Sequence, residues 1–273
     1  MLQAALSAAG APPPPWEDPE WESAVPARPP VKRPPARHPA RPVLARSPME
    51  ITLWCVDSSF WTAECVRLCL FRTGVPFHDC RLSWDELCRS GKLRFGSCPV
   101  LEVNGHIIAQ PHAIAAYVGK LTGLYPQDPW LAAKVDEILG GLTNVTDLLA
   151  KTLQEKNMPR RLRWRQSMIK EDGRLTHLLA GVEAVISEYG EHNLCAGSEL
   201  SVADFAVWRA VGWITGCLEG IPNDYIPCCF PHLWALHKQI DSLACVREWK
   251  EAHPSRHRTA CQFEGASAPF RTE

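Results

Sequence analysis

The feature that most constrains the fold is a change of hydrophobic pattern at residues 125–129, a short linker that contains two prolines. Before this linker, short β-type apolar runs are interspersed with segments of helical spacing. After it, apolar residues recur at every third or fourth position, which is typical of amphipathic helices. The pattern therefore predicts an α/β domain over residues 49–125, followed by an all-helical domain over residues 130–252.

The first domain has the predicted element order β-α-β, then a β-hairpin, then α. Two β-type runs, 51–56 and 77–82, flank a helical segment that ends at Gly74, a residue suited to the left-handed position after a helix. Asn104 and Gly105 separate two further β-type runs. This dipeptide favours a two-residue hairpin turn because both turn positions need positive φ.

The second domain shows helical patterns throughout. One long helix follows the linker, and residues 162–189 predict at least one more helix with an irregularity near Gly173. The next helix is expected to begin at Ser201, because Ser201 and Asp204 have the spacing of a capping box. The final apolar repeat, 233–249, predicts one last helix.

Residues 1–48 differ from the rest of the chain in composition. They hold 13 of the 24 prolines and few large aliphatic residues. Such a segment cannot bury enough apolar surface to offset the entropy lost on ordering. We therefore expect a disordered, Pro-rich extension at this end, and a tail over residues 253–273.

Charge and cysteine spacing limit the class of partner. The 29 Lys and Arg nearly balance the 30 Asp and Glu, for a net charge of −1, so neither nucleic acid nor an anionic membrane is expected. The apolar stretches fall short of the roughly 20 residues that cross a bilayer. The 12 cysteines include no Cys-x-x-Cys pair, so we expect no metal site and free thiols in a reducing cytoplasm.

Several strings resemble the cytosolic glutathione transferase family, most closely its sigma-like class, which includes prostaglandin D synthase and the S-crystallins. FGSCPVLEVNG at 95–105 resembles the cis-proline loop and hairpin of the family, and LSVADF at 200–205 resembles the cap of its helical domain. The similarity covers about residues 50–252. It implies a thioredoxin-like N-terminal domain and an all-α C-terminal domain, glutathione as co-substrate, a small hydrophobic electrophile and a homodimer.

The resemblance also implies positions for glutathione. The backbone of Cys98, before a cis-Pro99, would pair with the tripeptide like an added strand, and Gln110 would contact the γ-glutamyl group. Trp84 and Lys92 would lie near the glycine end. Each side chain also has a structural alternative: a turn proline, a surface amide, a packing aromatic ring or a solvated lysine.

Four positions depart from the family pattern. Trp54 stands where the sigma-like class has its catalytic Tyr, and Thr62 replaces an Arg. Asn144 replaces the acidic residue contributed across the dimer. Pro111 replaces a Ser that holds the γ-glutamyl carboxylate, and proline supplies neither the hydroxyl nor the backbone N–H.

The missing Tyr leaves open which group would ionise the glutathione thiol. A thiol titrates near about 8.5, and a pKa lower by about two units stabilises the thiolate by about 2.7 kcal/mol. Ser58 and Ser59 are candidates because a hydroxyl at a helix N-terminus favours a thiolate, although one of them could simply cap the helix. Trp54 is the third candidate, with a weakly acidic N–H, and Cys55 is interpreted as a buried structural thiol.

Three functions remain open from the sequence. The first is a glutathione transferase whose electrophile lies between the two domains, near Trp164, Val211 or Trp213. The second is a non-catalytic scaffold or dimerisation protein that keeps the fold. The third is a glutathione-dependent isomerase, which needs the same thiolate as the transferase.

Overall fold

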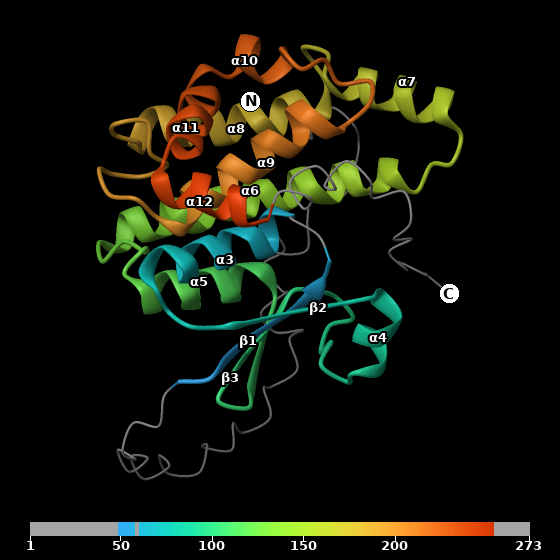
Figure 1. Cartoon of the computed structure of the whole chain (residues 1–273). Helices are drawn as coiled ribbons and strands as arrows, with labels where there is room; N and C mark the ends of the chain where they lie inside the picture. The colour runs from blue at the N-terminus through green and yellow to red at the C-terminus, as the bar shows by residue number, and fades with distance from the viewer. Residues whose placement is uncertain (1–48, 58–59, 254–273) are drawn as a thin grey trace, which may run out of the picture. The chain divides into compact units, whose positions relative to one another are not determined.

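A computed structural model describes residues 49–57 and 60–253 (Figure 1). The chain divides into two units, 1–47 and 48–273, and the described residues all belong to the second unit. The expected disordered extension and most of the expected tail lie outside the described residues.

A four-stranded mixed sheet forms the N-terminal part of this unit, in the order β2-β1-β3-β4. Strand β1 pairs in parallel with β2 and antiparallel with β3, and β3 pairs antiparallel with β4. Asn104 and Gly105 both have positive φ at the β3–β4 turn, as predicted. The strands are β1 (Ile51–Val56), β2 (His78–Leu82), β3 (Val100–Val103) and β4 (His106–Ala109).

Three helices accompany the sheet: α3 (Trp61–Thr73), α4 (Trp84–Arg89) and α5 (Pro111–Thr122). Figure 1 shows α3 and α5 side by side between the sheet and the remaining helices, with α4 apart from them beside the sheet. Helix α3 ends at Gly74 with φ 67°, as predicted, but it begins at Trp61 rather than Ala63. The short helix α4 was not predicted; it is set by the Ser83–Glu86 capping box.

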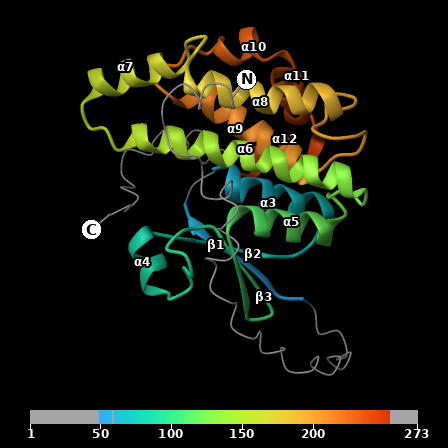
Figure 2. The same cartoon turned by 180° about the vertical axis from the view of Figure 1, so that it is seen from behind.

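The remaining chain is helical, as predicted, and Figure 2 shows these helices stacked on the side of α3 and α5 that faces away from the sheet. Helix α9 is the central one: 12 of its 16 residues are buried. One continuous apolar core joins β1 and α3 to α9 and α11. The helices are α6 (Pro129–Leu153), α7 (Met158–Met168), α8 (Arg174–Tyr189), α9 (Val202–Cys217), α10 (Tyr225–Cys229), α11 (Pro231–Asp241) and α12 (Ala244–Ala252).

The prediction of one final helix over 233–249 was wrong. The helix is interrupted between α11 and α12, because the backbone of Leu243 is extended, with φ −63° and ψ 137°. Just before it, the Ser242 hydroxyl donates to the Gln239 carbonyl at 2.7 Å. The apolar spacing continues in phase across this break, so periodicity alone could not reveal it. No helix within the described part of the chain is both long and apolar enough to cross a membrane.

Candidate functional site

The loop before β3 brings Cys98 to the end of the β3–β4 pair. The Cys98–Pro99 peptide bond is cis, Pro99 is buried, and Cys98 is half-buried against the core. The ladder between the two strands ends at Val100 and Ala109. The backbone of Cys98 therefore continues past the last strand pair, where an extended peptide can pair with it.

Gln110 turns the chain out of β4 and into α5. It is exposed and has a φ of 78°, a backbone region that favours glycine and costs other residues about 1–3 kcal/mol. Its carbonyl accepts the N–H of Ile114 at 3.0 Å, while its side chain makes no cap to α5. A strained, exposed polar residue at this edge is the kind of feature that gathers at binding sites.

Pro111 occupies the first position of α5, where its fixed φ suits a helix start. The N–H groups of His112 and Ala113 follow in the first turn, and helix geometry gives them no carbonyl partner within the helix. The first turn of α5 contains no acidic residue. The partial positive charge at this end of α5 therefore favours a negatively charged group.

Trp54 and Lys92 share one partner, Glu102. The Trp54 indole N–H donates to Glu102 Oε2 at 2.9 Å, and Lys92 Nζ lies 2.7 Å from the same oxygen. Lys92 Nζ also lies 4.5 Å from the centroid of the Trp54 ring, and its hydrogen bond holds the pKa of Glu102 below the usual value. Both groups are engaged on the sheet face opposite Leu53 and Cys55, and the expected roles of Trp54 in activation and of Lys92 at the glycine end stay predictions.

Trp84 lies in a different setting from Lys92. It is the first residue of α4 and is half-buried, next to the N-cap Ser83, whose hydroxyl accepts the N–H of Glu86 at 3.3 Å. The structure thus keeps Trp84 and Lys92 on one segment, as the sequence implied, but only Lys92 reaches the sheet through a hydrogen bond.

Ser58 and Ser59 lie outside the described residues, between two anchored neighbours. Asp57 accepts from Arg81 at 3.1 Å, and Phe60 packs edge-to-face on Trp213 of α9, with ring centroids 4.9 Å apart. Trp213 and Val211 are buried in the core rather than open to a cleft, whereas Trp164 on α7 is 39% exposed. The expected electrophile lining at Val211 and Trp213 therefore needs correction.

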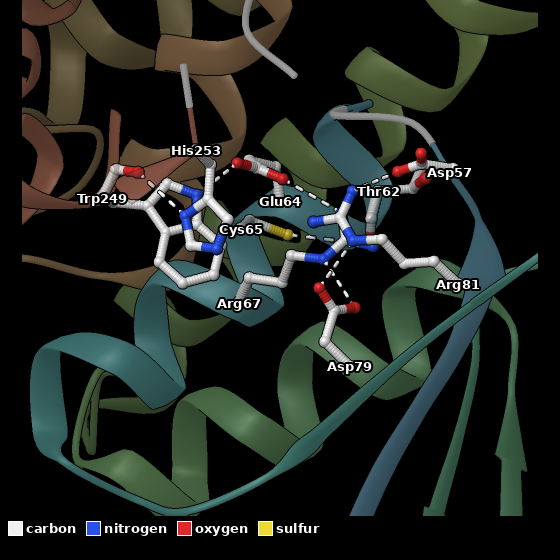
Figure 3. Close-up of polar contacts among 9 residues, drawn as sticks. All are labelled: Asp57, Thr62, Glu64, Cys65, Arg67, Asp79, Arg81, Trp249 and His253. Carbon is white, nitrogen blue, oxygen red and sulfur yellow. Dashed lines mark hydrogen bonds and ion pairs between the residues drawn. The ribbon is translucent and has the colours of Figure 1, made fainter. Parts of the chain in front are cut away.

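A charged network reaches Asp57 at the end of β1, and the sequence did not predict it (Figure 3). Arg67 on α3 is fully buried and contacts Glu64 and Asp79, each at 3.0 Å. Asp79 in turn binds Arg81 at 2.7 Å, and Arg81 continues to Asp57. The network therefore joins α3 and β2 to the end of β1.

Helix α12 completes this network. The Trp249 indole N–H donates to Glu64 Oε1 at 2.6 Å. The Glu64 carboxylate therefore contacts both a guanidinium and an indole.

Across residues 49–57 and 60–253, no three His, Cys, Asp or Glu side chains gather in a way that could hold a metal ion.

Comparisons with known proteins agree on the fold. No protein-family model matches the chain. The chain is 25% identical over 214 residues to glutathione S-transferase alpha-2 of Rattus norvegicus, and the match covers 76% of this chain and 92% of that protein.

Two solved structures show the same arrangement. Prostaglandin synthase D of Nilaparvata lugens superposes with a TM-score of 0.64 at 23% identity, over 75% of this chain and 98% of that one. A glutathione S-transferase of the hookworm Necator americanus, described as monomeric, gives a TM-score of 0.63 at 22% identity, over 75% and 98%. The fold is that of the glutathione transferases, and the curated relatives that the chain resembles are glutathione S-transferases.

Proposed function

We propose that this protein is a sigma-like glutathione transferase that joins the glutathione thiolate to a small hydrophobic electrophile. The observation that carries the proposal is Gln110, held exposed at positive φ where β4 ends and α5 begins. That conformation is unfavourable unless the position is needed. It sets a polar amide beside the α5 N-terminus, at the end of the strand pair from which Cys98 projects.

In this proposal the tripeptide pairs with the Cys98 backbone, and its γ-glutamyl carboxylate meets Gln110 and the first turn of α5. The hydroxyl of Ser58 or Ser59 donates a hydrogen bond to the sulfur and favours its thiolate. The thiol proton passes to solvent, and the thiolate attacks the electrophilic carbon: a carbon–sulfur bond forms, and the bond to the leaving group breaks as that group departs with its electron pair. Because the first Tyr of the chain is Tyr117, a serine hydroxyl replaces the usual tyrosine.

The test is retention on glutathione-agarose together with turnover of a generic aromatic electrophile. We expect the wild-type chain to be retained, and either Ser58→Ala or Ser59→Ala to lower kcat about 10–100-fold, the effect of losing a hydrogen bond to a charged group. Thr62→Ala, in the first turn of α3, is the matched hydroxyl control and should leave kcat unchanged. A folded chain that is not retained would support the scaffold function instead, and loss of retention would also remove the isomerase function.

Gln110→Gly should separate binding from stability. Glycine relieves the positive φ, so the free energy of unfolding is expected to rise by up to about 1 kcal/mol. The loss of the amide should weaken glutathione binding about 10-fold or more. Titration calorimetry and urea unfolding measure the two effects.

Asn104→Gly is the matched control for this prediction. Asn104 also has positive φ, but it lies in the hairpin turn at the other end of β3. This variant loses the hydrogen bond from the Glu50 N–H to Asn104 Oδ1 at 2.9 Å, so it should not gain stability, but it should leave the glutathione affinity unchanged. Unchanged affinity in Gln110→Gly as well would remove Gln110 from the proposed site.

We further propose that the protein forms a homodimer, as the family resemblance implies. Phe95, in the loop before Cys98, is 61% exposed, so its ring is available for contact with a second copy. Sedimentation equilibrium distinguishes a dimer from a monomer such as the hookworm structure.

A further inference from the structure

Two thiols meet next to the Cys98 backbone, where glutathione is proposed to bind. Cys55 is a core residue of β1, 3% exposed, whereas Cys98 is half-buried before β3. These segments are neighbours, because Trp54 pairs with Val100 in the last register pair of β1 and β3. The side chains of Cys55 and Cys98 are hydrogen-bonded to each other. Cys55 therefore has a specific polar partner, in addition to the core packing expected for it.

The surroundings shift the pKa values of the two thiols in opposite directions. The hydrogen bond from Cys55 lowers the pKa of Cys98 to about 7, against the effect of burial and with help from the Val56 N–H and from Arg67. The hydrogen bond with Cys98 and the burial of Cys55 raise the pKa of Cys55 well above its usual value. The Asp79 carboxylate raises this pKa further. Cys98 is thus the nucleophile at neutral pH, and Cys55 holds the proton.

We propose that Cys98 and Cys55 form a dithiol redox site that exchanges with glutathione disulfide, with Cys98 as the attacking residue and Cys55 as the resolving residue. The position of Cys98 supports this assignment: a peptide that pairs with its backbone is delivered to the residue that carries the thiolate. This choice of disulfide rests on the proposed function, whereas the thiol pair itself does not.

The exchange proceeds in two steps. The Cys98 thiolate attacks one sulfur of glutathione disulfide, so that a Cys98–glutathione disulfide forms, the original S–S bond breaks, and one glutathione leaves as a thiolate. Cys55 then gives its proton to solvent and attacks the Cys98 sulfur, which releases the second glutathione. The two cysteines are oxidised to one disulfide and glutathione disulfide is reduced to two glutathiones; excess glutathione reverses both steps.

The test is peptide mapping by mass spectrometry after incubation of the reduced full chain with glutathione disulfide. We expect a Cys55–Cys98 linkage in the wild type and a trapped glutathione adduct on Cys98 in Cys55→Ser, with Cys55→Ala as a second variant should serine destabilise the core. Cys80→Ser is the matched control: Cys80 is half-buried on the adjacent β2, its pKa is raised by burial, and its loss should change nothing.

Two outcomes would overturn the proposal. One is an unmodified Cys98 in both Cys55 variants while the exposed Cys88 of the same sample is modified. The other is a wild-type adduct on Cys98 that never resolves to the linkage. Repeating the incubation with hydroxyethyl disulfide separates the redox site from the proposed transferase function. The Cys55–Cys98 linkage should still form with this disulfide even if the protein does not bind glutathione.

The pH dependence of Cys98 alkylation provides an independent readout. In the wild type the rate should reach half its maximum near pH 7, because Cys98 must be deprotonated to react. Cys55→Ala removes the donor that stabilises this thiolate, so the midpoint should move to higher pH, while Arg67 and Asp79 remain in place. An identical midpoint in the two proteins would contradict the hydrogen-bonded pair.

Discussion

Arg67→Met is expected to lower the free energy of unfolding by about 3–5 kcal/mol, because it leaves the buried carboxylate of Glu64 without its cation. Arg67 is fully buried between Glu64 and Asp79. Burial alone would lower the pKa of this guanidinium, but the neighbouring Glu64 outweighs it and the pKa is raised. Urea unfolding followed by circular dichroism measures the loss.

The double variant Arg67→Met with Glu64→Gln should recover part of that loss, because the buried negative charge on α3 is removed while Asp79 keeps Arg81. Lys134→Met is the surface control: Lys134 pairs with the exposed Glu137, and such pairs contribute little. An Arg67→Met protein as stable as Lys134→Met would show that the network does not hold α3 and β2 together.

Asp204→Ala should be the second most damaging substitution, with an expected loss of about 3–5 kcal/mol. The fully buried Asp204 carboxylate accepts the N–H groups of Cys195 and Ser201, both at 2.7 Å, and the Ser201 hydroxyl at 2.8 Å. Alanine leaves these donors buried and unpaired at the start of the central helix α9. Thermal and urea unfolding should both show the loss.

A second capping box in the same chain supplies the control. Glu86 accepts the Ser83 N–H at 2.9 Å at the start of α4, but this box is exposed to water. Glu86→Ala should therefore cause a much smaller loss, since water replaces the carboxylate. Equal losses in the two variants would mean that burial does not set the strength of the α9 cap.

Local signals predicted much of the fold. The Asn104–Gly105 turn, the end of α3 at Gly74 and the Ser201–Asp204 box each depend on a few neighbouring residues, and each was correct. The break before α12 was missed because Leu243 keeps the apolar spacing in phase. Helix α4 was missed because it is too short to show a helical period.

The candidate site was less predictable because it depends on pairing across strands. Trp54 and Glu102 meet through the β1–β3 register, and a shift of one residue would have placed them on opposite faces. Cys55 and Cys98 likewise come together only once these segments are aligned. In the charged network, the Glu64–Arg67 spacing shows in the sequence, but their burial under Trp249 does not.

The hydrogen bond between Trp249 and Glu64 has a consequence for how the chain matures. It spans 185 residues, so the first helix after β1 obtains this partner only when the last helix has been made. Such distant closure is slow and late in a folding reaction. The nascent thioredoxin-like half therefore emerges from the ribosome with the carboxylate of Glu64 still lacking its indole partner, and it reaches its final form only after α12 has been synthesised.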